Sequence, residues 1–123
     1  MNWSVTAAAL LAMAVILGAF GAHGLRDRLD AYSMGVYEKA VFYHFIHALG
    51  MLAVAVFPRV GALTNEGSAR VCGLLLLGIA LFSGSLYLLA VNGLRVLGAV
   101  TPFGGLAFIA GWLLLAYYLL QQS

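Results

Sequence analysis

Four long apolar segments follow one another along the chain, separated by short stretches where polar residues, glycine and proline gather. The segments cover residues 3–24, 33–57, 68–92 and 102–120. Each approaches or exceeds the ~20 residues that an α-helix needs to cross a bilayer. Runs such as GLLLLGIALF lack the alternation of a half-buried strand, and backbone groups in lipid must bond within their own segment. The pattern predicts an all-α integral membrane protein, with one four-helix transmembrane bundle formed by residues 1–123.

Punctuation residues mark the ends of these segments. Pro58 stops the second segment because proline lacks the backbone N–H that a helix requires. Ser68 is a candidate N-cap for the third helix, and the NG dipeptide at 92–93 suits its C-terminal end. Thr101 followed by Pro102 predicts an N-cap and the first residue of the fourth helix.

The connection after the first segment differs from the others. Leu25, Leu29 and Tyr32 recur at helical spacing, with charged residues between them. This pattern suits a short interfacial helix in the headgroup region. A solvated loop explains the same residues equally well, so both alternatives stay open.

Basic residues divide unequally between the two sides of the predicted bundle. Four crossings place both termini on the side of the 58–67 turn. The opposite side holds more basic residues, namely Arg26, Arg28, Lys39 and Arg95 against Arg59 and Arg70. The positive-inside rule then predicts cytoplasmic first and third connections.

Composition narrows the class of protein further. Hydrophobic residues make up 64% of the chain and charged residues 8%, against about 25% charged in a soluble domain. A formal net charge of +2, without a basic cluster, gives no reason to expect a nucleic-acid partner. The single cysteine, Cys72, excludes an intrachain disulfide and a multi-cysteine metal site.

Small residues four positions apart predict close helix packing, because lipid offers no hydrophobic drive between helices. The predicted packing residues are Ala14, Gly18 and Ala22 on the first helix, Ala80 and Gly84 on the third, and Ala107 and Gly111 on the fourth. Such faces also suit self-association into a homo-oligomer.

Polar side chains fall into one half of the predicted bundle. They are His23, Glu38, Tyr43, His44, His47, Ser83, Ser85, Tyr87, Asn92 and Thr101. Polar groups facing hydrocarbon are costly, so these side chains should turn inward. We therefore expect a one-sided polar pocket that opens toward the first and third connections.

Three uses of this pocket stay open. The first is an interhelical hydrogen-bond network. The second is a ligand site, with His44 and His47 on one metal and His23 or Glu38 completing the shell, or with two histidines ligating haem. The third is a path for protons or a small solute, which uses the near-neutral pKa of histidine. No spacing is diagnostic of a metal, and no catalytic constellation stands out.

Four ordered motifs, GAFGAHGL, YHFIHAL, FSGSLYLL and TPFGGLAFIAGW, resemble the signature stretches of a small membrane-protein family. This is the domain-of-unknown-function 423 family, which includes proteins called transmembrane protein 256, and the resemblance covers about residues 17–112. It implies a four-helix protein of the bacterial or mitochondrial inner membrane, and it supplies no activity. The polar positions that match the motifs are His23, His47, Ser83, Ser85, Tyr87, Thr101 and Pro102. The family usually carries glutamine in place of His44, which shifts the expected site toward His23 and His47.

The sequence favours a non-enzymatic accessory or scaffold subunit that binds another membrane protein complex or lipid. Short connections and the missing catalytic constellation support this interpretation. The alternative is a small carrier or redox helper that holds a proton, quinone, haem or metal in the polar pocket.

Overall fold

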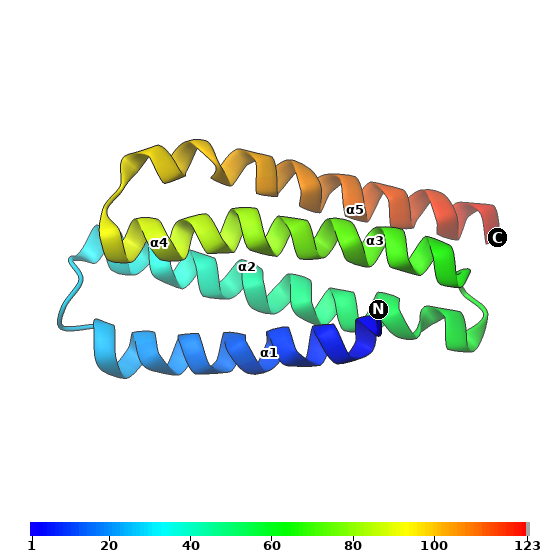
Figure 1. Ribbon diagram of the computed structural model, residues 1–123, viewed down its shortest axis with the longest axis horizontal. Helices are drawn as coiled ribbons and strands as arrows, with labels where there is room; N and C mark the ends of the chain where they lie inside the picture. The colour runs from blue at the N-terminus through cyan, green and yellow to red at the C-terminus, as the bar shows by residue number, and fades with distance from the viewer. Residues whose placement is uncertain (123) are drawn as a thin grey trace.

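The computed structural model describes residues 1–122 and consists of long helices joined by short turns (Figure 1). Four helical segments are long and apolar enough to cross a membrane: Trp3–Leu25, Ala31–Val60, Asn65–Asn92 and Arg95–Gln122. Residues 1–122 contain no β-strand. The predicted all-α fold with four spans is confirmed.

Each span is one continuous helical segment with a change of helix type along its length. The elements in chain order are α1 (Trp3–Phe20) with the π-helical η1 (Gly21–Leu25), α2 (Ala31–Val56) with the 3₁₀ turn η2 (Phe57–Val60), α3 (Asn65–Gly78), the π-helical η3 (Ile79–Ser83), α4 (Gly84–Asn92), the 3₁₀ turn η4 (Arg95–Ala99) and α5 (Thr101–Gln122). A single helical segment, α3–η3–α4, therefore forms the third span.

The four spans lie side by side, with two central and two peripheral helices (Figure 1). α1 packs mainly against α2, whereas α5 packs mainly against α3 and η3. α2 also contacts α3, η3 and α4, so these elements form the centre. α1 and α5 consequently lie at opposite edges, and both termini point toward the end that carries the α2–α3 connection (Figure 1).

The connection between α1 and α2 is a hydrogen-bonded turn. The backbone N–H groups of Arg28 and Leu29 donate to the Leu25 carbonyl over 2.9 and 3.0 Å. Asp30 then caps α2 by accepting from the Ser33 N–H over 2.7 Å, and this bond lowers the pKa of the Asp30 carboxyl. No separate interfacial helix forms here, because the chain has only these few residues in which to reverse direction.

The third span begins earlier than the predicted cap. Thr64 accepts from the Gly67 N–H over 2.9 Å and α3 starts at Asn65. Ser68 lies on the buried face, where its hydroxyl donates to the Val54 carbonyl of α2 over 2.9 Å. The prediction of Ser68 as the N-cap is therefore wrong, because the polar turn offers an earlier cap and Ser68 bonds across the helix interface instead.

Thr101 also serves another helix rather than its own N-terminus. α5 begins at Thr101, with Pro102 in its first turn. The Thr101 hydroxyl bonds to the Leu97 carbonyl over 3.3 Å and to the Ser85 hydroxyl over 2.6 Å. The Ser85 bond connects α5 to α4, and the Leu97 bond connects α5 to η4. The predicted cap role is therefore wrong, while the predicted start of the helix differs by only one residue.

Two glycines with positive φ end helical segments as their positions suggest. Gly61 follows η2 with φ 77°, and Gly93 follows α4 with φ 69°. Both values lie in the left-handed region that glycine adopts at little cost. Pro58 lies within η2, directly after α2 has ended. The second span thus stops where the sequence predicts it.

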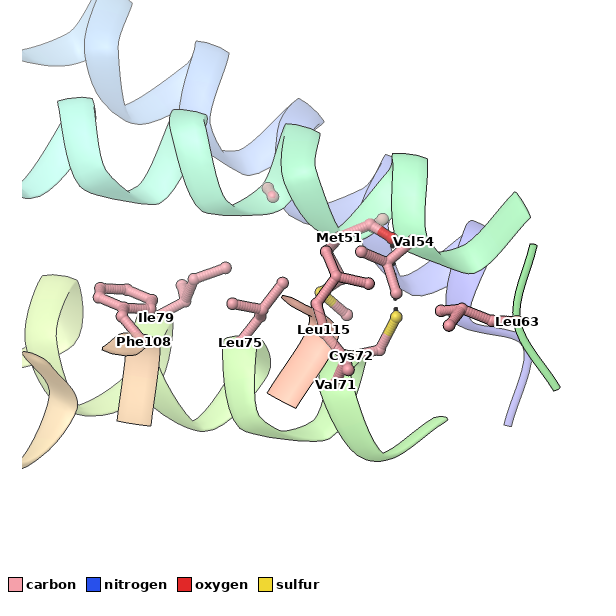
Figure 2. Close-up of a cluster of buried hydrophobic side chains, with 11 residues drawn as sticks. Met51, Val54, Leu63, Val71, Cys72, Leu75, Ile79, Phe108 and Leu115 are labelled. Carbon is pink, nitrogen blue, oxygen red and sulfur yellow. Dashed lines mark hydrogen bonds between the residues drawn. The ribbon is translucent and has the colours of Figure 1, made fainter. Parts of the chain in front are cut away.

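A buried cluster with residues from all four spans fills the centre (Figure 2). Met51 and Val54 of α2 meet Val71, Cys72 and Leu75 of α3, and all five are 0 or 1% exposed. The Cys72 thiol lies 3.6 Å from the Met51 carbonyl oxygen. Cys72 is a small packing residue, consistent with its place in an apolar segment.

Glycines permit the closest approaches around this core. A Cβ on Gly104 of α5 would overlap the backbone of Phe82 in η3, so these two backbones are in direct contact. A Cβ on Gly78 would overlap the ring of Phe108, which lies flat over the missing side chain. Both contacts join α5 to the third span, and both require that the position has glycine, which lacks a side chain.

The predicted small-residue face of α1 is used over part of its length. Ala14 is fully buried, and a Cβ on Gly18 would lie in ordinary contact with Val41 of α2, at 3.4 Å. Ala22, one turn further, is exposed. The predicted face therefore packs at Ala14 and Gly18 but not at Ala22, although Gly21 beside it contacts Tyr37 of α2.

The other two predicted packing faces behave differently from each other. Ala107 and Gly111 of α5 are buried, and a Cβ on Gly111 would lie 3.1 Å from Leu75. Ala80 is exposed, and Gly84 has no side chain from another helix within 4 Å. The Ala80–Gly84 face therefore makes no helix contact within residues 1–122.

We expect Gly104→Ala to destabilise the protein by about 1–3 kcal/mol, because the new methyl group would collide with the Phe82 backbone. Gly105→Ala is the matched control: its Cβ would lie 3.8 Å from the Phe82 ring, so helix propensity should make it neutral or stabilising by up to about 1 kcal/mol. Thermal unfolding in detergent micelles, followed by circular dichroism, measures both. Equal stability of the two variants would contradict the close α5–η3 contact.

Candidate functional site

The ten polar residues predicted to share a pocket fall into three classes of exposure. Buried are His44, His47, Ser83 and Ser85; half-buried are Tyr43, Tyr87 and Thr101; exposed are His23, Glu38 and Asn92. The structure brings the first two classes together at the interfaces between α2, the third span and α5. It leaves the third class outside this group.

His44 joins three helices. Its Nδ1 lies 2.8 Å from the Tyr87 hydroxyl of α4. Its Nε2 is buried and points toward the backbone of Leu10 on α1, without reaching a hydrogen bond. A neutral ring that accepts from the Tyr87 O–H and turns Nε2–H toward α1 fits both neighbours.

His47 makes its hydrogen bond within α2. Its Nδ1–H donates to the Tyr43 carbonyl over 2.8 Å, which fixes the tautomer because a carbonyl can only accept. The imidazole stacks on the Phe108 ring of α5, with centroids 3.5 Å apart and planes 12° from parallel. His47 is thus a flat ring packed between α2 and α5.

An aromatic group surrounds His47. The Tyr43 ring lies 4.4 Å from Phe82 and 5.8 Å from His47, measured between centroids. Trp112 of α5 lies 5.8 Å from His47, and its indole fills the space left by the missing side chain of Gly50. Rings from three spans interlock here, so this group contributes packing between helices.

Hydroxyl groups supply further bonds between spans. The Ser83 hydroxyl, fully buried, donates to the Ala40 carbonyl of α2 over 2.8 Å. Ser85 lies 2.9 Å from the Phe82 carbonyl and 2.6 Å from the Thr101 hydroxyl. These groups satisfy one another inside the protein, as buried polar groups in lipid must.

Tyr37 joins this network although the sequence reasoning did not single it out. Its hydroxyl donates to the Leu17 carbonyl of α1 over 2.5 Å, and its ring lies over Gly21. Tyr37 and His44 are seven residues apart, so they share one face of α2. That heptad spacing, together with Gly21 opposite, is the signal that could have identified it.

His23 and His47 do not meet. Gly21 contacts Tyr37, and His47 lies ten residues further along α2, a separation of about 15 Å along the helix axis. His23 is exposed on η1 at the end of the peripheral first span, whereas His47 faces α5 at the opposite edge. The expected pocket centred on this pair is therefore not formed, because the two rings belong to different sides of α2.

The arrangement also does not converge on a metal. His44 faces α1 and α4, whereas His47 faces α5. Within residues 1–122, no three histidine, cysteine, aspartate or glutamate side chains are grouped as metal ligands. The two histidines instead bond or stack with their neighbours, and the same orientation argues against a shared haem between them.

A groove lies on the outer surface between α1 and α2. Its volume is about 510 Å³, and its floor includes Gly18, Gly21 and Ala22. Arg26 and Glu38 line the same groove at the end nearest the α1–α2 connection. Tyr37 lines this groove as well, whereas none of the buried histidines or serines does.

We expect Tyr87→Phe to destabilise the protein by about 1–2 kcal/mol, because it leaves the buried Nδ1 of His44 without a partner. His44→Leu should cost a similar amount, whereas His44→Gln should be better tolerated since an amide can still bond the Tyr87 hydroxyl. Unfolding in detergent micelles measures each variant, with Tyr117→Phe on exposed α5 as control. A Tyr87→Phe protein as stable as this control would contradict a structural role for the bond.

Comparisons with known proteins agree on one family. The family model described as "Protein of unknown function (DUF423)" matches residues 17–105. The chain is 48% identical over 103 residues to UPF0382 membrane protein SSP2132 of Staphylococcus saprophyticus, covering 84% of this chain and 83% of that protein. It is 46% identical over 104 residues to UPF0382 membrane protein YwdK of Bacillus subtilis, covering 84% and 83%.

A relative from a different bacterial group gives the same result. The chain is 44% identical over 103 residues to UPF0382 inner membrane protein YgdD of Escherichia coli, which covers 82% of this chain and 76% of that protein. No solved structure matches the chain. With a family model over most of its length and relatives well above 30% identity, this multi-pass membrane protein belongs to the DUF423 family.

Proposed function

We propose that this protein is a non-enzymatic accessory or scaffold subunit of the bacterial inner membrane, and that it acts through its outer surface on another membrane component. The proposal rests on the observation that the buried polar side chains already have partners within the protein. His44, Ser68, Ser83 and Ser85 all bond to groups of the protein itself, and His47 is stacked and bonded. Interior polar groups engaged in this way stabilise helix contacts, so the remaining candidate surface is the outside.

The two edge helices offer that surface. Val15 and Ile16 of α1 are 56 and 65% exposed, and Leu113 of α5 is 66% exposed. Large apolar side chains at such positions contact either acyl chains or a neighbouring helix. The name of the relative YgdD, an inner membrane protein, supports the same location for this chain.

A second candidate function is a small carrier or redox helper, with His44 as its reactive group. Within residues 1–122, Nε2 of His44 is the one buried side-chain nitrogen or oxygen without a hydrogen-bond partner. Visible absorption and elemental analysis of the purified protein test for haem and metal. Proton flux into liposomes tests for conduction, and His44→Leu should abolish it. The accessory proposal expects no chromophore and no flux that depends on His44.

We expect that a photoreactive residue on one edge helix, in native membranes, gives a discrete protein adduct. Val15 on α1 and Leu113 on α5 have similar exposure, so exposure alone predicts equal labelling at both. If a specific partner binds, one of the two positions should give the protein adduct, and added wild-type chain without the photoreactive residue should reduce it. The measurement is mass analysis of the adducts after mild solubilisation.

The buried Val71, at 0% exposure, is the control position and should give no intermolecular adduct. Lipid adducts alone at both edges would argue against a protein partner. So would diffuse protein adducts that wild-type chain fails to compete.

A further inference from the structure

The groove between α1 and α2 has a polar end and an apolar length. Along α2 it extends from Met34 to Leu49, about 22 Å at 1.5 Å per residue. The hydrocarbon of one leaflet is only about 15 Å thick. Phe42 and Phe45 line the apolar part, whereas Arg26 and Glu38 line the end near the connection. The groove therefore has the same polarity, from headgroup to tail, as a lipid in that leaflet.

The two charges at the polar end have no partner within the protein. In the described chain the single ion pair joins Arg70 to Glu66, at the opposite end of the molecule. Arg26 and Glu38 line one groove without forming such a pair, and neither side chain has a hydrogen bond. A carboxylate on a membrane-spanning helix is costly unless a cation meets it. The polar end thus calls for an occupant that carries an anion and a cation close together.

The charges at the polar end decide between a protein helix and a lipid as occupant. An apolar helix would leave Arg26 and Glu38 unpaired. A lipid places hydrocarbon against the apolar length lined by Phe42 and Phe45, and a zwitterionic headgroup matches the two charges.

We propose that this groove binds a phospholipid with a primary ammonium headgroup, of the phosphatidylethanolamine type. Its phosphate would pair with Arg26 and its ammonium with Glu38, while one acyl chain lies over Gly18, Gly21 and Ala22. Phosphatidylcholine has no N–H to donate to Glu38, and phosphatidylglycerol has no cation for it. The inference rests on the proposed function in taking the outer surface as the working surface, and it names one ligand of that surface.

Native mass spectrometry of the delipidated full chain, with lipids of identical acyl chains, tests the proposal. Wild-type protein should retain phosphatidylethanolamine about tenfold better than phosphatidylcholine, since a charge-assisted hydrogen bond is worth about that factor. Glu38→Gln should reduce this preference to about one. Arg26→Gln should weaken retention of phosphatidylethanolamine, phosphatidylcholine and phosphatidylglycerol together by about tenfold.

Neighbouring charges outside the groove provide matched controls. Lys39→Gln and Arg28→Gln change adjacent exposed residues that do not line it, and both should bind as wild type. Ala22→Leu fills the groove without changing charge and should lower retention of all three lipids. It keeps the test decisive if a charge variant does not fold, which helical melting in detergent reports.

Equal retention of phosphatidylethanolamine and phosphatidylcholine by wild type would overturn the proposal. So would charge variants that behave like their controls.

Two other results would assign the groove to a different occupant. An Ala22→Cys chain in a Cys72→Ala background that crosslinks to a second copy, unaffected by added lipid, would assign the groove to self-association. A bound quinone that Arg26→Gln releases would likewise replace the lipid. If photocrosslinking gives a protein adduct that wild-type chain competes, but the groove shows no lipid preference, only this inference is refuted. If the groove prefers phosphatidylethanolamine but no protein adduct forms, only the protein partner is refuted.

Discussion

Close approach between helix backbones is the interaction on which this structure depends. Inside a bilayer the lipid tails are as apolar as leucine, so burying leucine yields little and packing contacts must hold the helices together. Gly104 lets α5 touch η3, and the rings of Phe108 and Trp112 fill the spaces left by Gly78 and Gly50. Added side chains at these glycines would separate the helices that the rest of the molecule requires.

The polar side chains act within this framework as interhelical bonds. Tyr37 and His44 of α2 connect it to α1 and α4, and Ser83 connects η3 back to α2. A hydroxyl or imidazole in hydrocarbon must find a partner, so each such bond also selects the rotation of its helix. His44 bonds the Tyr87 hydroxyl and His47 stacks on Phe108, so both histidines contribute contacts between α2 and its neighbours.

We propose that function lies on the exterior of the molecule. α1 and α5 lie at opposite edges (Figure 1). Both expose large apolar side chains, and α2 does so at Phe42 and Leu49. Between α1, η1 and α2 the surface is hollowed into the groove, with Arg26 and Glu38 at its polar end. Arg26 and Glu38 line this groove without forming an ion pair.

The sequence by itself determined the four spans. The length and hydropathy of a segment are local properties, and they decide whether a helix can cross the hydrocarbon of a bilayer. It also determined the stop at Pro58 and Gly93, and the polar character of the half where Ser83, Ser85 and His44 lie. Only tertiary structure decided that Ser68 bonds Val54 rather than capping a helix, and that His23 stays outside while Tyr37 goes in. Helical periodicity shows which residues share a face, but the neighbour that each face meets depends on helix rotation and order. Close glycine contacts and interhelical hydrogen bonds between distant segments set both.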